Sequence, residues 1–170
     1  HNITETHGVI KKVYYKEEPV VSSEVIRSIK EADLILLSMG SLYTSIIPNL
    51  ICKDVIEAID KSHAQVMYVC NMMTQPGETD NFTVADHIKV LNKYLGKHKV
   101  DTVIANEGII DKVLRDKYAD LEQKDPVKVD IAALKELNVQ IIEDDFVIIE
   151  DGVLRHNTMK LAFHIFSNLL

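Results

Sequence analysis

Residues 32–50 read ADLILLSMGSLYTSIIPNL, and this stretch predicts a strand, a polar loop and a helix in that order. The apolar run Leu34–Leu37 is typical of a strand buried on both faces of a parallel sheet. A tight turn at Gly40 follows, and Pro48 leads into a helix-like run. Loop amides and a helix N-terminus meet where such a strand ends, which favours phosphate binding. The loop adds four hydroxyl groups, on Ser41, Tyr43, Thr44 and Ser45.

The alternative interpretation of these hydroxyl groups is structural. Serine and threonine side chains commonly cap loops and helix ends, and they need no ligand to do so. Strand–loop–helix segments of this kind also occur in many proteins that bind no phosphate. The sequence leaves both interpretations open.

The rest of the chain alternates strand-like and helix-like runs. Further strands are expected at Val9–Tyr15, Val66–Cys70, Thr102–Ala105, Val127–Val129 and Val139–Ile142. Helices are expected over residues 22–30, 50–61, 83–94, 109–118 and 131–137. The pair Asp151-Gly152 predicts a β-hairpin, and Asn157 is expected to cap a terminal helix that runs to Leu169. Residues 1–170 are therefore predicted to form one α/β domain, with a mainly parallel sheet flanked by helices.

Composition and charge exclude several classes of protein. The formal net charge of −7 argues against nucleic acid as a partner, because phosphate backbones require a basic face. No apolar run approaches the ~20 residues of a membrane span, and no signal peptide is visible, so a cytoplasmic protein is expected. Cys52 and Cys70 lack the spacing of a metal or redox pair and are expected to be buried. The polar segment 1–8, which begins with His, indicates part of a longer protein.

A second polar loop, Asn71–Asp80, follows the predicted strand Val66–Cys70. It is longer than most connections in α/β units, which favours a functional role. Asn71 and Thr74 come directly after the strand and are expected to line a site together with the first loop. Glu78 and Asp80 are candidate Mg²⁺ ligands, so Mg²⁺ is an optional cofactor. The favoured alternative is that they stabilise the next helix N-terminus, with Asp80 as its cap. No transition-metal site is expected.

No motif for a catalytic nucleophile is present, so no catalytic residue is assigned. Arg155 lies between a predicted strand and a helix start, where a bound anion would stabilise it. Its alternative role is a surface ion pair with Glu150 or Asp151. Tyr118, at the end of its predicted helix, either stacks on a base or packs on the core.

Three segments together resemble the YvcK-type gluconeogenesis factors, a family within the CofD-like superfamily and related to 2-phospho-L-lactate transferases. The segments are residues 41–50 (SLYTSIIPNL), 71–80 (NMMTQPGETD) and 154–157 (LRHN). They occur in the family's order, and the chain resembles the C-terminal portion of the family. Two departures are Ser38-Met39-Gly40-Ser41, where the family usually has Gly-Pro-Gly-Ser, and Asn81, where it usually has Gly.

The resemblance implies a Rossmann-like fold and a regulatory protein that binds a UDP-sugar, notably UDP-N-acetylglucosamine. It also implies links to gluconeogenic carbon metabolism, cell-wall synthesis and cell shape. Tyr118 and Arg155 match the family's tyrosine and arginine for the nucleotide sugar. The expected ligand-binding residues are therefore Gly40, Ser41, Leu42, Tyr43, Thr44, Ser45, Asn71, Thr74, Tyr118 and Arg155.

Two other functions stay open at this point. One is a Mg²⁺-dependent transferase that moves a phospholactyl-type group from a nucleotide diphosphate, although no general base is evident. The other is an oligomerisation scaffold whose loops are only structural. The sequence does not decide between a monomer and a homo-oligomer, and it names no protein partner.

Overall fold

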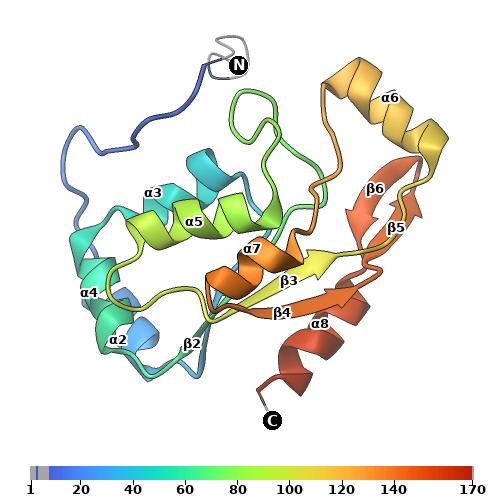
Figure 1. Cartoon of the computed structure of the whole chain (residues 1–170). Coiled ribbons are helices and arrows are strands. Elements are labelled where there is room, and N and C mark those ends of the chain that lie inside the picture. The colour runs from blue at the N-terminus through green and yellow to red at the C-terminus, as the bar shows by residue number, and fades with distance from the viewer. Residues whose placement is uncertain (1–2, 4–7, 170) are drawn as a thin grey trace.

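A computed structural model describes residue 3 and residues 8–169 of the chain, and four parallel strands form its main sheet (Figure 1). The strands lie side by side in chain order: β1 (Leu34–Leu37), β2 (Gln65–Val69), β3 (Thr102–Asn106) and β4 (Gln140–Asp144). The α/β prediction is confirmed, with all four strands within a few residues of their expected positions. Most of the polar segment 1–8 lies outside the described residues.

One face of the sheet carries the helices that connect the strands. These are α4 (Lys53–Lys61), α5 (Val84–Tyr94) and α7 (Ile131–Glu136), with α3 (Ile47–Leu50) between α4 and α5, and α2 (Ser23–Glu31) against α4. Right-handed crossovers between neighbouring parallel strands place all connecting helices on the same face. Ile88, Leu91 and Leu134 are fully buried there, against Tyr68 and Val103 of the sheet. This layer forms the larger part of the core.

The opposite face is covered by the terminal helix α8 (Thr158–Ser167), which Figure 1 shows on the other side of the sheet from α5 and α7. Leu161 of α8 packs in a second, smaller apolar cluster with Met67, Val69, Ile104, Ile142 and Phe146. Asn157 accepts a hydrogen bond from the Lys160 amide, which confirms its predicted role as the cap of α8.

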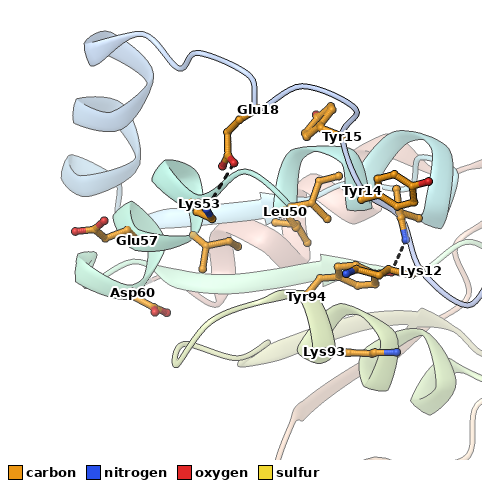
Figure 2. Close-up of a pocket in the computed structure, with 13 residues that line it drawn as sticks. Lys12, Tyr14, Tyr15, Glu18, Leu50, Lys53, Glu57, Asp60, Lys93 and Tyr94 are labelled. Atoms are coloured by element: carbon orange, nitrogen blue, oxygen red, sulfur yellow. Dashed lines mark hydrogen bonds and ion pairs between the residues drawn. The ribbon is translucent and has the colours of Figure 1, made fainter.

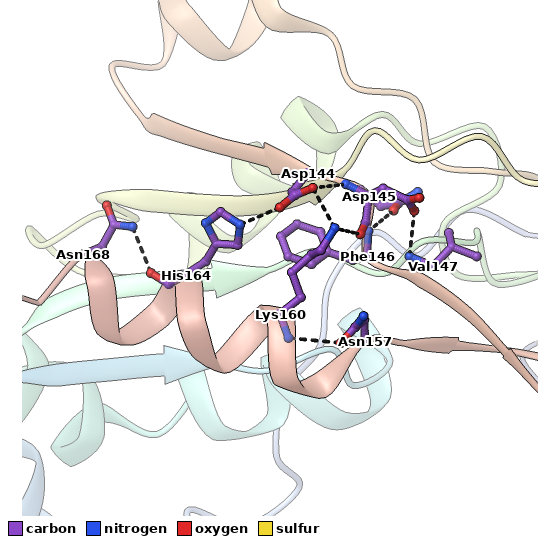
Figure 3. A network of polar contacts seen from close by, with 9 residues as sticks. Asp144, Asp145, Phe146, Val147, Asn157, Lys160, His164 and Asn168 are labelled. Carbon is purple, nitrogen blue, oxygen red and sulfur yellow. Dashed lines mark hydrogen bonds and ion pairs between the residues drawn. The ribbon is translucent and has the colours of Figure 1, made fainter.

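A polar network fastens α8 to the end of β4 (Figure 3). One oxygen of the Asp144 carboxylate accepts from Lys160 Nζ at 3.0 Å, and the other accepts from His164 Nε2 at 2.8 Å. Lys160 Nζ also donates to the Asp145 carbonyl. These hydrogen bonds lower the pKa of Asp144 to about 2, chiefly through His164 and then Lys160.

The remaining elements lie at the carboxyl ends of the strands. They are α6 (Lys112–Glu122) and a hairpin of β5 (Val147–Glu150) and β6 (Val153–His156). Asp151 and Gly152 both have positive φ, 52° and 73°, as the predicted tight turn requires. Among the described residues, no helix is long and apolar enough to cross a membrane.

Two predicted strands are wrong. Residues 9–15 form an extended strap without strand partners. Val13 N donates to the Tyr94 hydroxyl (Figure 2), and the Tyr15 hydroxyl donates to the Pro48 carbonyl. β-branched residues favoured a strand, but the strap lies on helices, where no strand edge is offered. Residues 127–129 make only one isolated bridge, from Lys128 to Thr83, because their backbone pairs with loop and helix-start residues. The predicted helix 50–61 is also interrupted, since α4 begins only at Lys53.

We predict that Asp144→Asn removes a pH-dependent part of the stability. An unfolded aspartate titrates near pH ~4, whereas Asp144 in the fold titrates at about 2. The network therefore stabilises the fold above pH ~4, and this contribution is lost as the pH falls toward 2. Thermal midpoints between pH 2 and 7 should converge for the variant and the wild type at low pH. Asp116→Asn on the exposed part of α6 is the control; a constant deficit for Asp144→Asn at every pH would contradict the prediction.

Candidate functional site

A cleft of about 320 Å³ opens beyond the carboxyl end of β2. Its walls are the segment that follows β2, the second half of α6 and the turn end of the hairpin. The carboxyl ends of parallel strands are where α/β sheets commonly bind ligands. The residues that line it are Met39, Asn71, Met72, Met73, Thr74, Gln75, Lys117, Tyr118, Glu122, Lys124, Gly152, Val153, Leu154 and His156.

Backbone pairing holds the floor of the cleft in place. Thr74 N donates to the Asp125 carbonyl at 2.7 Å, and Asp125 N donates to the Thr74 hydroxyl at 2.9 Å. Val127 N donates to the Met72 carbonyl at 2.9 Å. Thr74 is 3% exposed, so these bonds are shielded from water. The segment after β2 is therefore tied to the segment after α6, although its sequence resembles that of a loop.

Tyr118 joins two walls of the cleft. It is 7% exposed, and its hydroxyl accepts a hydrogen bond from Leu154 N at 3.0 Å, which ties α6 to the hairpin. Lys124 Nζ lies 6.0 Å from the centre of its ring. The ring is packed, as one of the two sequence interpretations of Tyr118 had it, and it also lines the cleft. Whether it contacts a base stays a prediction.

The cleft carries a small excess of positive charge. Lys117 and Lys124 line it, and Glu122 pairs with Lys124 at 2.6 Å. His156 lies within 3.4 Å of the Cys70 carbonyl, to which its Nε2 donates. Burial lowers the pKa of His156, so its ring is neutral at neutral pH. Two lysines against one glutamate suit an anionic ligand.

The first loop differs from the prediction. A π-helical turn, Leu42–Ile46, continues into α3, so the helix begins near Leu42 rather than Pro48. Leu42 and Tyr43 are buried in the core, and burial raises the pKa of Tyr43. Gly40 has close contacts, since an added Cβ would lie 3.0 Å from Ser45 Cβ. Leu42 and Tyr43 therefore belong to the core, although they also lie in the segment 41–50 that carries the family resemblance.

The N-terminus of this helix already has an anion. Glu78 accepts a hydrogen bond from Tyr43 N and another from the Thr44 hydroxyl, both at 3.1 Å. A ligand phosphate on the same amide would have to displace this carboxylate. The sequence favoured a role for Glu78 at the N-terminus of the helix that follows its loop. Glu78 instead stabilises the N-terminus of the helical segment before the loop, which begins at Leu42.

Asp80 does not cap the next helix, as the sequence suggested. Its carboxylate accepts from Gly77 N within the loop, whereas Thr83 and Asp86 cap α5 by a reciprocal capping box. Asp86 takes part in this capping box, whereas its neighbour His87 is buried beside Phe82. In the part of the chain that the structure describes, no three His, Cys, Asp or Glu side chains gather as a metal site would require.

Three of the ten predicted ligand residues line the cleft: Asn71, Thr74 and Tyr118. The first loop adjoins it, because Asn71 Nδ2 donates to the Gly40 carbonyl and Gln75 Nε2 donates to the Ser41 hydroxyl. Arg155 lies outside the lining. Its Nε is 3.4 Å from a Glu150 oxygen on the neighbouring strand, and both side chains are largely exposed. Strand alternation explains this, since Leu154 and His156 face the cleft.

Sequence reasoning missed Lys117, Glu122, Lys124 and His156. Lys117 lay next to Tyr118 in the sequence, and His156 lay next to Arg155. Strand alternation is the signal that could have found His156. Residues i and i+2 of a strand share a face, so an apolar Leu154 that faces inward predicts that His156 faces inward as well. Lys124 had no signal, because its position depends on the left-handed Gln123 (φ 53°) that ends α6.

A second cavity, of about 700 Å³, lies under the strap on the helical layer (Figure 2). It lies on the helices rather than at the carboxyl ends of the strands, and its three lysines are balanced by three acidic residues. Lys53 pairs with Glu18 at 3.6 Å, Glu57 pairs with Lys61, and Asp60 accepts from His98 N. The cleft near β2 is therefore the better candidate site.

The family model described as 2-phospho-L-lactate transferase CofD matches residues 1–147, which end at the first residue of β5. This chain belongs to the CofD family. It is 42% identical over 154 residues to the gluconeogenesis factor of Bacillus subtilis, covering 90% of this chain and 48% of that protein. It is also 42% identical over 139 residues to the gluconeogenesis factor of Halalkalibacterium halodurans, covering 82% of this chain and 43% of that one.

A crystal structure of a Bacillus halodurans protein has the same fold as this CofD-family chain. The TM-score is 0.89 at 39% identity, and the match covers 97% of this chain and 53% of the other. The chain thus spans about half or less of the length of these relatives. Asn81, where the family usually has glycine, has φ 61°, a conformation that asparagine tolerates.

We predict that Thr74→Val destabilises the fold by about 1–3 kcal/mol, because the Asp125 amide then loses its acceptor, the buried Thr74 hydroxyl. Valine has nearly the same shape as threonine, so packing is preserved. Urea unfolding followed by circular dichroism measures the change. Thr158→Val, at an exposed position at the start of α8, is the control and should change stability by less than ~0.5 kcal/mol. Equal effects of the two substitutions would show that the Thr74–Asp125 bonds do not hold the cleft floor.

Proposed function

We propose that this chain forms part of a regulatory protein that binds a nucleotide sugar, with UDP-N-acetylglucosamine as the leading ligand. The observation that carries the proposal is the cleft at the end of β2, where two lysines and an aromatic ring come together. The groups of a nucleotide sugar match these side chains. Its diphosphate would accept hydrogen bonds from Lys117 and Lys124, and its planar base, or its sugar, would pack against Tyr118. The names of the relatives support a role in gluconeogenic carbon metabolism; roles in cell-wall synthesis and cell shape rest on the family resemblance.

The polar groups of the cleft floor would fix the orientation of the ligand. Asn71 lines the cleft while its amide holds Gly40, so a ligand contact there would reach the first loop. Gln75 Oε1 is buried without a hydrogen-bond partner among the described residues, which leaves an acceptor beside the cleft. Arg155 could contact the ligand if its ion pair with Glu150 breaks. The loss of free energy would be small, because exposed ion pairs contribute only ~0–1 kcal/mol.

A transferase is the second candidate, and the description of the matching family model favours it. Such an enzyme would move a phospholactyl-type group from a nucleotide diphosphate with the help of Mg²⁺. Glu78 and Asp80 would be its nearest acidic groups, although both are engaged in hydrogen bonds within the protein. Release of a nucleotide monophosphate from a nucleotide-diphospho substrate, dependent on Mg²⁺, would identify this activity.

The test of the leading proposal is a thermal shift of the full-length protein with UDP-N-acetylglucosamine, UDP and GTP, with and without Mg²⁺. A ligand at ~100 times its dissociation constant stabilises the folded state by about 2.7 kcal/mol. We expect this shift with the UDP-sugar. A shift with GTP and Mg²⁺ but with neither UDP ligand would contradict the proposal and favour the transferase.

We predict that Lys117→Ala and Lys124→Ala each weaken binding of UDP-N-acetylglucosamine by about tenfold or more. A hydrogen bond to a charged group contributes about 1.5–3 kcal/mol, and 1.4 kcal/mol corresponds to tenfold in affinity. Arg155→Ala should weaken it as well, as the resemblance implies. Isothermal titration calorimetry measures the affinities. Lys112→Ala, at the start of the same helix as Lys117 and outside the cleft, is the control. Unchanged affinity in both cleft variants would place the ligand elsewhere.

A further inference from the structure

The proposed function leaves the cavity under the strap without a role. Its volume, about 700 Å³, is about twice that of the cleft at the end of β2. Small-molecule sites commonly have volumes of about 300–1,000 Å³. The strap covers the cavity, and α3, α4 and α5 form the opposite wall (Figure 2). The cavity is therefore large enough for a small organic molecule.

Aromatic and apolar side chains make up much of the wall of this cavity. Tyr14 and Tyr15 come from the strap, and Tyr94 comes from the end of α5. Three of the six tyrosines of the chain thus gather around one cavity. Leu50 and Ile56 add aliphatic groups from the helices. Such a surface favours contact with a planar ring.

Hydrogen bonds hold the strap on both sides of Tyr14. Val13 N donates to the Tyr94 hydroxyl at 3.0 Å, and the Tyr15 hydroxyl donates to the Pro48 carbonyl at 2.6 Å. The Tyr94 oxygen is the acceptor in the first bond, so its own hydrogen is free to donate to a further group. Tyr94 thus offers a hydrogen-bond donor at the wall of a cavity whose cover is already in place.

The acidic groups that line the cavity are already engaged. Glu18 and Glu57 pair with lysines, and Asp60 accepts a hydrogen bond from a backbone amide of the loop after α5 at 2.9 Å. Among residues 8–169, no carboxylate pairs with Lys12 or Lys93. Figure 2 shows Lys12 at the end of the cavity opposite Glu57 and Asp60. The unmatched charge of the cavity is therefore positive, and it lies at the end where α5 contributes Lys93.

We propose that the cavity under the strap binds an organic anion that carries an aromatic ring. The ring packs between the strap tyrosines and the helices, and the anionic group accepts hydrogen bonds from Lys12, Lys93 and the Tyr94 hydroxyl. A neutral ring would not use these donors, and a small inorganic anion would leave the aromatic surface uncovered. The cavity and the cleft share no lining residue, so this site does not depend on the proposed function.

The probe for this site is anilinonaphthalene sulfonate, which joins aromatic rings to a permanent negative charge. Fluorescence titration of the full-length protein should show saturable binding. The double variant Lys12→Ala/Lys93→Ala should bind the probe about tenfold or more weakly, because it loses hydrogen bonds to a charged group. The matched control is Lys16→Ala/Lys89→Ala, which removes a lysine just after the strap and another from α5, both outside the cavity. An unchanged affinity of the Lys12/Lys93 variant, or an equal loss in the control, would overturn the proposal.

Competition tests the ring and the charge separately. Naphthoate carries both and should displace the probe from the wild-type protein. Naphthylmethanol keeps the ring without the charge, and sulfate keeps the charge without the ring. Neither should displace the probe at the concentration at which naphthoate does. Displacement by one of these two at that concentration would contradict a ligand that needs both parts.

Lysine acetylation locates the bound probe. Acetic anhydride modifies exposed amines, and an anion held by Lys12 and Lys93 shields both. With saturating probe these two lysines should be acetylated more slowly, as measured by mass spectrometry, whereas Lys16 and Lys89 should react as before. Protection of lysines elsewhere, such as those of the cleft, with none at Lys12 and Lys93, would place the probe in another site and overturn the proposal.

Discussion

Apolar side chains project from both faces of β2 and β3, so both faces of this sheet must be shielded from water. Right-handed connections place α4, α5 and α7 on one face, and α8 alone among the described helices packs on the other. The Asp144–His164–Lys160 network keeps α8 in place. With the helices on the faces, the carboxyl ends of the strands stay free for loops, and the candidate cleft is built there.

The cleft is held by hydrogen bonds between segments that are far apart in the sequence. The Thr74–Asp125 bonds join the segment after β2 to the segment after α6, and the Tyr118–Leu154 bond joins α6 to the hairpin. Each bond fixes one wall relative to another before any ligand arrives. Preorganisation of this kind lowers the entropic cost of binding a ligand, which is consistent with the ligand proposed above.

Much of the fold could be predicted from the sequence, because the strands and the Asp151-Gly152 turn have strong local signals. The strap at residues 9–15 could not, since its partners are the Tyr94 hydroxyl and the Pro48 carbonyl rather than a strand. The site was predicted in part. Asn71, Thr74 and Tyr118 line the cleft, whereas Leu42 and Tyr43 are core residues. Glu78 takes the helix N-terminus that the sequence offered to a phosphate, a long-range contact that no local pattern reveals.

We propose that the cleft between α6 and the hairpin holds a nucleotide sugar. A crystal structure of the protein grown with UDP-N-acetylglucosamine tests it most directly. The account predicts density for the diphosphate within hydrogen-bond reach of Lys117 or Lys124, with the base or the sugar against Tyr118. Density for the ligand under the strap, beside Tyr94 and Lys93, would contradict it.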